Sequence, residues 1–216
     1  MEMFSLDSKN YHVWTYRHWL VRHFGLWDSD REIQDVEALI NSDVRNNSAW
    51  NRRWVLKFGP RSSVDSGMPT SIDENGNRGR LEVVDEDLVD SELDYAKSQI
   101  LLAPENRSPW SYARAILRVS GRPMAELKTF ATRFVTEETD GDGRSKEIQV
   151  KSSLALEWLA DVFAEEADAG PEQERRADAV KMLTLLKEKY DPVRSNYWDY
   201  RIRILGCEPM ETECMT

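Results

Sequence analysis

The segment NYHVWTYR at residues 10–17 decides the fold, because worn copies of it recur along the chain. The shared pattern is Asn-x-x-x-Trp-x-x-Arg. The further copies are NNSAWNRR at 46–53, NRSPWSYA at 106–113, which has lost the arginine, and RSNYWDYR at 194–201, which has lost the leading asparagine. A degenerate copy around Trp158 divides the longest gap between them. Repetition at intervals of about 35 to 45 residues predicts a solenoid of helical hairpins.

The first copy predicts such a hairpin from its own residues. Apolar side chains after Asn10 fall on two faces of a helix, which suits a helix between two neighbours. Gly25 allows this helix to end, and Ser29-x-x-Glu32 has the spacing of a capping box at the start of a second helix. The second helix has an apolar stripe between Ile33 and Ile40.

The rest of the chain extends the pattern into an all-α fold, a right-handed α-α superhelix of the TPR-like type. We expect one helical-repeat domain over 1–216, with repeats near 9–42, 45–102, 105–136, 148–168 and 171–206. The fourth repeat is degenerate, and the second contains a polar loop insertion at 60–80. Ser108-Pro109 predicts the N-cap and first turn of a helix. Further helices are expected at 124–134 and 148–167, and the segment between them at 137–146 is predicted to be an acidic loop. No stretch alternates with period two over a useful length, so no strand is expected.

Composition excludes several classes of protein. The 216 residues are 40% hydrophobic but contain no apolar run long enough to span a membrane. The only cysteines, Cys207 and Cys214, favour a cytoplasmic location over a disulfide-stabilised secreted protein. A net charge of −10 argues against binding to nucleic acid, which depends on cationic side chains.

Positive charge gathers in the first two repeats, and two interpretations of it stay open. The cluster either pairs with acidic helices of neighbouring repeats, which we favour, or faces an anionic ligand. Its members are Arg17, His18, Arg22, His23, Arg45, Arg52 and Arg53. A metal site at His12, His18 and His23 is disfavoured because their helical spacing separates them. No nucleotide-binding loop or catalytic triad has a recognisable context, so we do not expect complete catalytic machinery in this chain.

Several segments together resemble the α subunit shared by protein farnesyltransferase and type I protein geranylgeranyltransferase. The similarity is dense over 9–54, where it includes KNYHVW at 9–14, LWD at 26–28 and DVRNNSAWN at 43–51. It continues more loosely through PENRSPW at 104–110, Ser152-Ser153 and YWDY at 197–200. The α subunit of Rab geranylgeranyltransferase shares the repeat, but the segment at 43–51 is more similar to the farnesyltransferase type.

This resemblance implies a crescent of helical hairpins around a β subunit that is an α/α barrel. The β subunit would hold zinc, and the active heterodimer would also use magnesium in some cases; no cofactor is expected on this chain. The zinc-bound cysteine thiolate of a C-terminal CaaX protein would attack C1 of a prenyl diphosphate, farnesyl or geranylgeranyl. Cationic and hydrogen-bonding groups at the subunit boundary would stabilise the leaving diphosphate.

The resemblance places Tyr11 and His12, with Asn10 beside them, in the vicinity of that diphosphate. Asn10 has the stronger case as a helix cap whose side chain bonds backbone at the helix start. The repeat residues are expected to be structural, the tryptophans filling space between helices and Arg17 bonding carbonyls of an adjacent loop. They are Trp14, Trp50, Trp110 and Trp198, with Arg17, Arg53 and Arg201.

One departure from the family concerns the N-terminus. The lysine and glutamine that contact the diphosphate and the substrate carboxylate in this family lie in a repeat before the one that contains Asn10. We therefore expect this chain to correspond to the C-terminal part of an α subunit, inactive alone, with an aromatic face exposed around 11–24. We do not give Lys9 the role of that lysine. The alternative is a free helical-repeat scaffold that binds proteins and has no catalytic role.

Overall fold

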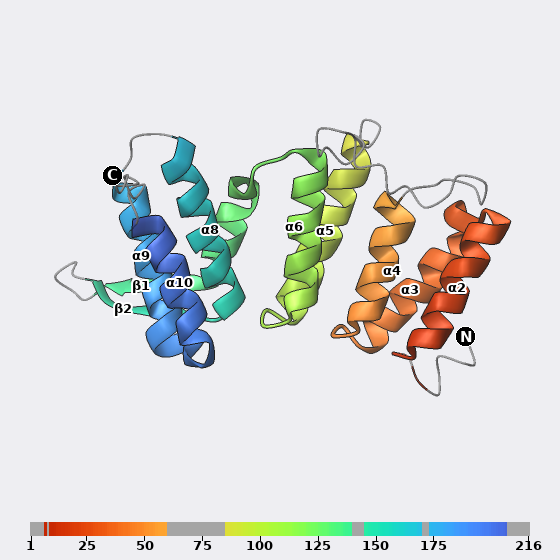
Figure 1. Cartoon of the computed structure of the whole chain (residues 1–216), viewed down its shortest axis with the longest axis horizontal. Helices are drawn as coiled ribbons and strands as arrows, with labels where there is room; N and C mark the ends of the chain where they lie inside the picture. Colours follow the sequence, from red (N-terminus) through yellow and green to blue (C-terminus); the bar gives the residue numbers. More distant parts are fainter. Residues whose placement is uncertain (1–6, 8, 60–84, 140–144, 170–172, 207–216) are drawn as a thin grey trace, which may run out of the picture. The chain divides into compact units, whose positions relative to one another are not determined.

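The computed structural model describes residues 7, 9–59, 85–139, 145–169 and 173–206, and the chain divides into two compact units. The units are Met1–Ser120 and Gly121–Thr216. Nearly all regular structure in both is helical (Figure 1), so the predicted all-α, helical-repeat fold class is confirmed. That the units form one domain with the predicted repeat boundaries stays a prediction.

The first unit consists of five α-helices and one short 3₁₀ helix among its described residues. They are α2 (Tyr11–Phe24), η1 (Leu26–Asp28), α3 (Asp30–Ser42), α4 (Asn47–Phe58), α5 (Glu86–Leu102) and α6 (Arg107–Ser120). The closest neighbours are α3 with α4 and α5 with α6. Each pair is joined by a tight four-residue turn, at 43–46 and at 103–106, so the best-packed hairpins straddle the boundaries of the predicted repeats.

These turns explain why asparagine and tryptophan recur at a fixed spacing. The indole Nε1 of Trp50 donates to the carbonyl of Val44 at 2.8 Å, and Trp110 does the same to Pro104 at 2.9 Å. Asn106 also donates to the Val44 carbonyl, at 2.7 Å, and thereby ties the third copy to the turn of the second. The repeated tryptophan therefore fills the core and donates a hydrogen bond to a carbonyl of the turn before its helix.

The second unit follows a less regular plan. Its elements are η2 (Met124–Leu127), α7 (Lys128–Thr132), β1 (Val135–Thr139), β2 (Ser145–Val150), α8 (Ser153–Ala169), α9 (Gln173–Leu185), the π-helical turn η3 (Leu186–Tyr190), η4 (Pro192–Arg194) and α10 (Ser195–Gly206). Helices α8 and α9 form its closest pair. Trp198 again binds the turn before its helix, with Nε1 3.1 Å from the Asp191 carbonyl. Trp158, in the degenerate copy, is buried and instead donates to the Met124 carbonyl at 3.2 Å.

The expectation of no strands is wrong, because β1 and β2 form an antiparallel hairpin within the predicted 137–146 loop and its flanks. Val135 pairs with Val150 and Glu137 with Ile148. The β-branched residues at both ends of this acidic segment favour strands, and the hydroxyl of Tyr190 fixes β2 by donating to the Ile148 carbonyl at 2.7 Å. Consequently α8 begins at Ser153, later than the predicted helix at 148–167, and the predicted helix at 124–134 is divided between η2 and α7.

Two predicted helix caps are also wrong. Ser29 makes no side-chain hydrogen bond to the start of α3, and Glu32, the other half of the expected capping box, binds arginines instead. Asn106, not Ser108, caps α6, since its side-chain oxygen accepts from the Ser108 backbone N–H at 3.3 Å. The predicted end of α2 is confirmed, with Gly25 in the left-handed conformation at φ 63°. The predicted loop at 60–80 lies outside the described residues.

Candidate functional site

The three residues predicted near the diphosphate lie together at the N-terminus of α2. The side chain of Asn10 accepts from the backbone N–H groups of His12 and Val13, at 3.0 and 3.3 Å, which confirms its predicted role as a cap. Tyr11 and His12 project from the first turn with their ring centroids 5.7 Å apart in an edge-to-face arrangement. Tyr11 is 75% exposed, so its hydroxyl is open to a ligand or a partner.

The electrostatic setting of this turn favours an anion. The first turn of α2 contains no acidic residue, and the N-terminus of a helix carries a partial positive charge. Lys9 is 3.0 Å from the carboxylate of Asp43, an exposed pair. Hydrogen bonds from Lys9 and from the Arg45 backbone hold the pKa of Asp43 below its usual value. Lys9 therefore has a partner on the turn before α4 in this structure.

The repeated arginines bind acidic residues of neighbouring helices. Arg17 reaches Glu32 at 2.9 Å and Asp35 at 2.6 Å on α3, which replaces the predicted bonds to loop carbonyls as its principal interaction. In the second unit Arg201 on α10 pairs with Asp161 on α8. Carboxylates attract the guanidinium more strongly than neutral carbonyls do. Among the buried members of the basic cluster, Arg52 and Arg53 pair with Glu32 and Glu37 of the preceding predicted repeat, as the favoured interpretation expects. The partners of Arg17 lie within its own predicted repeat instead.

The most deeply buried of these pairs joins α4 to α5. Arg53 donates from Nε and Nη2 to both oxygens of Glu92, at 2.6 and 2.9 Å, and both side chains are at most 4% exposed. The hydroxyl of Tyr112 on α6 donates to the same carboxylate at 2.8 Å, and Lys57 lies 3.3 Å away. Burial, and then the negative charge of Glu92, raises the pKa of Tyr112 well above its usual value. This network holds three successive helices in register.

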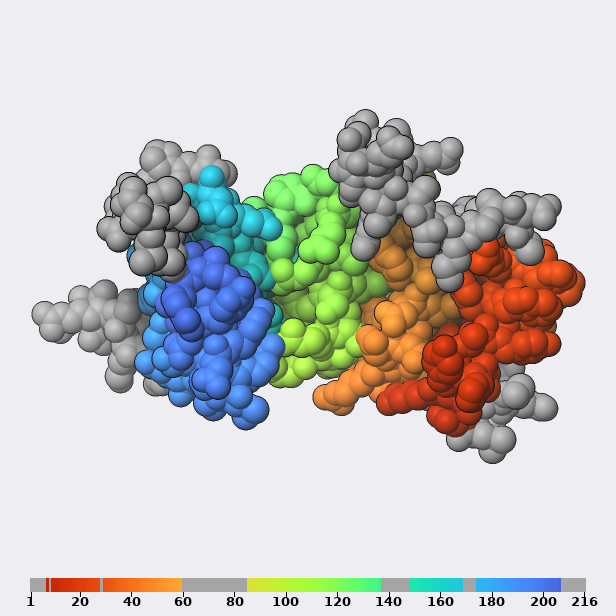
Figure 2. Space-filling model, in the orientation of Figure 1, coloured from red at the N-terminus to blue at the C-terminus, as the bar shows by residue number. Residues whose placement is uncertain are grey.

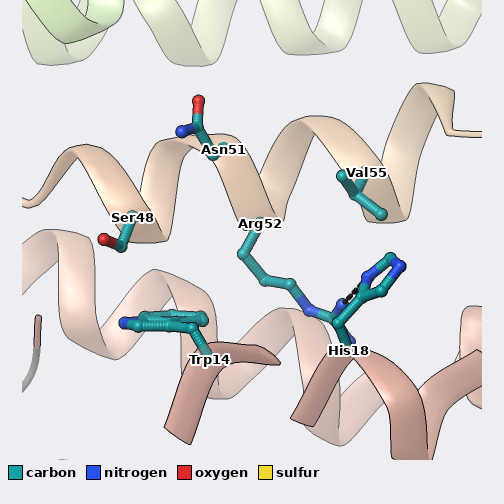
Figure 3. A pocket seen from close by; sticks show the side chains of 6 residues that line it. All are labelled: Trp14, His18, Ser48, Asn51, Arg52 and Val55. Atoms are coloured by element: carbon teal, nitrogen blue, oxygen red, sulfur yellow. Dashed lines mark hydrogen bonds between the residues drawn. The ribbon is translucent and has the colours of Figure 1, made fainter. Parts of the chain in front are cut away.

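A shallow groove of about 200 Å³ lies between α2 and α4 (Figure 3). It is lined by Trp14, His18, Ser48, Asn51, Arg52 and Val55. Figure 3 shows the side chain of Arg52 extending from α4 to the imidazole of His18 on α2. Arg52 Nη1 lies 3.1 Å from His18 Nδ1, and Arg52 Nη2 donates to Glu32 Oε2 at 3.0 Å. The groove thus exposes part of a charged network that continues into the core of the first unit.

Charge within this network favours ionised Glu32 and neutral His18. Burial of Glu32 opposes its ionisation, but hydrogen bonds from Arg17 and Arg52 outweigh burial and hold its pKa below the usual value. Partial burial, the adjacent Arg52 and the charge of Arg22 lower the pKa of His18. Neutral His18 accepts a hydrogen bond at Nδ1 from Arg52, which fixes its tautomer.

Sequence reasoning found the cations of these networks but missed their anions. Glu92 is 39 residues from Arg53, and no local spacing rule connects the two. The groove was also missed, although both of its basic residues belong to the predicted cluster. The one available signal was the doubled arginine in NNSAWNRR, where only the second matches the repeat pattern.

The described residues contain no group of three or more His, Cys, Asp or Glu side chains arranged to hold a metal ion. Their helices are also too short or too polar for any of them to cross a membrane. Zinc chemistry therefore has no evident ligands in the described part of this chain. The exposed helix start at Tyr11 and His12 and the groove between α2 and α4 are candidate binding features among the described residues.

Comparison with known proteins gives one matching family model and several relatives. The model "Protein prenyltransferase alpha subunit repeat" matches residues 1–24 and 29–58. The protein farnesyltransferase/geranylgeranyltransferase type-1 subunit alpha of Candida albicans is 35% identical over 93% of this chain and 68% of its own length. The subunit of the same name from Dictyostelium discoideum is 26% identical over 89% of this chain and 47% of its own length.

A solved structure leads to the same group of proteins. The structure of Candida albicans protein geranylgeranyltransferase-I complexed with GGPP has a chain that is 34% identical, with a TM-score of 0.72. The match covers 94% of the present chain and 56% of the solved one. The chain thus spans between about half and two thirds of the length of these relatives.

Proposed function

Because this chain belongs to the family of protein farnesyltransferase/geranylgeranyltransferase type-1 alpha subunits, we propose that it is the α subunit of a heterodimeric protein prenyltransferase. The enzyme transfers a farnesyl or geranylgeranyl group from its diphosphate to the cysteine of proteins that end in a CaaX sequence. The observation that carries the proposal is the 35% identity over nearly the whole chain, with the repeat tryptophans occupying equivalent structural positions. A cytoplasmic location is part of the proposal.

The division of work between the two subunits follows from the residues that this chain offers. We propose that the β subunit provides the zinc and that magnesium, where it is used, acts in the assembled dimer. When bound there, zinc would lower the pKa of the substrate's cysteine, so that it reacts as a thiolate. This chain supports the β subunit and contributes Tyr11 and His12 to the diphosphate site.

Within that site the N-terminus of α2 stabilises negative charge on the diphosphate. The hydroxyl of Tyr11 and the imidazole of His12 donate hydrogen bonds to it, and the cap formed by Asn10 holds the first turn in place. The contribution to rate comes from interactions that strengthen as charge develops on the leaving group. Tyr11 is exposed together with Tyr16, Trp19 and Phe24 of the same helix, and this run of exposed aromatic residues supports a role at a boundary with another protein.

The test is to co-express the full chain with a type-1 β subunit and measure both co-purification and prenyl transfer to a CaaX peptide. We expect a stable dimer in which Tyr11→Phe lowers kcat/KM about tenfold, because one neutral hydrogen bond is lost. His12→Ala lowers it by about a hundredfold, as the loss of a leaving-group donor does. His23→Ala on the same helix and Tyr200→Phe, both at exposed positions, are the matched controls.

Each outcome of this experiment separates the alternatives. A dimer in which the Tyr11 and His12 variants match the controls removes these two residues from the site but keeps the subunit assignment. Failure of the wild-type chain to associate with any type-1 β subunit contradicts the assignment and supports the scaffold alternative.

A further inference from the structure

Helix α2 buries little apolar surface against the rest of the first unit. Val21 is its one fully buried residue, whereas α4 buries several, Trp50 and Leu56 among them. The closest helix pairs of this unit are α3 with α4 and α5 with α6, and α2 belongs to neither. An element with few buried apolar contacts has a low free energy of local opening. The polar contacts of α2 therefore decide how firmly it is held.

Polar side chains tie the middle of α2 to two other helices. Arg17 pairs with Glu32 and Asp35 on α3. His18 meets Arg52 on α4, whose Nη1 lies 3.1 Å from His18 Nδ1 (Figure 3). The two contacts differ in their response to pH. A pair of arginine and carboxylate stays charged in neutral and mildly acidic solution, whereas an imidazole titrates there.

The contact between His18 and Arg52 requires a neutral imidazole. A guanidinium has only N–H donors, so Nδ1 of His18 accepts and the imidazole proton lies on Nε2. His18 is exposed, so solvent can reach the ring. Binding of a proton at Nδ1 replaces the acceptor by a second donor and places two positive charges side by side. The contact is then lost, while Arg52 keeps its hydrogen bond to Glu32 at 3.0 Å.

The charges that act on His18 disfavour its protonation. Partial burial, then the charges of Arg52 on α4 and Arg22 on α2, lower the pKa of His18. From α3, Glu32 is hydrogen-bonded to Arg52, and from η1 the uncharged ring of Trp27 lies 6.0 Å from the imidazole. We propose that the contact between His18 and Arg52 is a pH-sensitive link between α2 and α4, which is intact at neutral pH and breaks when His18 binds a proton.

The direction of the pH dependence follows from the preference for neutral His18 in the folded state. The link stabilises the docking of α2 fully above the ordinary pKa of 6.5, and this stabilisation is lost as the pH falls from there through the lower folded-state pKa. Tyr11 and His12 lie on the same helix. Acid therefore also loosens the proposed diphosphate site, a consequence that rests on the proposed function.

Hydrogen exchange of the full chain tests the link through the protection factors of α2 amides between about pH 7.5 and about pH 5.5. We expect protection of α2 to fall over this range while that of α5 and α6 stays constant. His18→Asn keeps a neutral acceptor near the place of Nδ1 and cannot titrate, so it should abolish the fall. His23→Asn makes the same exchange at an exposed position on α2 and should preserve it.

NMR titration of the imidazole groups measures the pKa of His18 directly. Arg52→Met removes both the donor and its charge, so the pKa of His18 should rise. The fold-loss of α2 protection in the wild type should not exceed the ratio of the His18 acid dissociation constants in the wild type and in Arg52→Met.

Two results overturn the proposal. One is an unchanged His18 pKa in Arg52→Met, and the other is a fall of α2 protection in His18→Asn as large as in the wild type. The exchange comparison is decisive even if Arg52→Met does not fold. Both measurements use the free chain without a β subunit, so they do not depend on the prenyltransferase assignment.

Discussion

Replacing Arg53 with methionine tests how far one buried ion pair holds the first unit together. The substitution keeps most of the side-chain volume but leaves Glu92, which is 2% exposed, without its principal partner. Removing one member of a buried pair costs about 3 to 5 kcal/mol. Lys57 at 3.3 Å and the Tyr112 hydroxyl at 2.8 Å still face the carboxylate, so we expect a loss near the lower end, about 3 kcal/mol.

By the same reasoning, the double variant should lose less stability than either single variant. Glu92→Leu leaves Arg53 with Glu37 at 2.9 Å, and a loss of about 3 kcal/mol is again expected. Arg53→Met with Glu92→Leu removes both charges and fills the space with apolar atoms, which brings stability back to within about 2 kcal/mol of the wild type. The double-mutant cycle should therefore give a coupling of about 4 kcal/mol or more between the two residues.

Urea titration followed by hydrogen exchange of peptides from α4 and α5 measures this loss where it occurs. Local exchange is preferable to a global signal because the chain comprises two compact units. Lys97→Met is the matched control, since it removes an exposed pair with Asp94 at 3.0 Å and should cost less than about 1 kcal/mol. A cost below about 1 kcal/mol for Arg53→Met, or a double variant as unstable as the sum of the singles, would refute the account.

Three further predictions concern single side chains of the first unit. The buried hydroxyl of Tyr95 has no partner among the described residues, and burial raises its pKa to about 12, so Tyr95→Phe should stabilise the unit by about 1 kcal/mol in urea titrations. Trp50→Phe loses the bond to the Val44 carbonyl, and because Asn106 still donates to that carbonyl, a loss of about 1 to 2 kcal/mol is expected, measured by thermal unfolding. The pKa of Glu32 is lower in the folded state than its ordinary value of 4.5. The ionised Glu32 therefore stabilises the fold fully at a pH above 4.5, and this stabilisation is lost as the pH falls through the folded-state pKa. The difference in unfolding free energy between wild type and Glu32→Gln should shrink in acid.

Local signals allowed much of the first unit to be predicted. Asn10 is recognisable as a cap because its side chain acts within three residues, and Gly25 as a helix end because few other residues adopt its backbone conformation. The tryptophan spacing is a local signal for the same reason: the indoles of Trp50, Trp110 and Trp198 each bind a turn carbonyl six or seven residues earlier. Interactions of this kind join residues that are at most seven positions apart, so a short segment of sequence is enough to predict them.

Local sequence signals did not predict the interactions between segments that are far apart in the chain. Glu32 has the spacing of a capping box, but its carboxylate binds two arginines from other helices. A charged guanidinium binds a carboxylate more strongly than a backbone N–H does. The hairpin of β1 and β2 was missed because its strands are short and acidic, and its support from Tyr190 lies about forty residues away. Periodicity describes one element at a time and contains no information about these partners.

The doubled arginine at 52 and 53 shows how one copy of the repeat departs from the pattern of the others. Arg53 obeys the rule of the repeat, in which the third residue after tryptophan pairs with an acidic residue of a neighbouring helix, as Arg17 and Arg201 also do. Arg52 is outside that rule and is almost as deeply buried. It is held by other partners, because its guanidinium donates to Glu32 on α3 and lies against His18 on α2. The second arginine of this copy therefore links α4 to both helices of the preceding hairpin, a role that the repeat pattern alone does not predict.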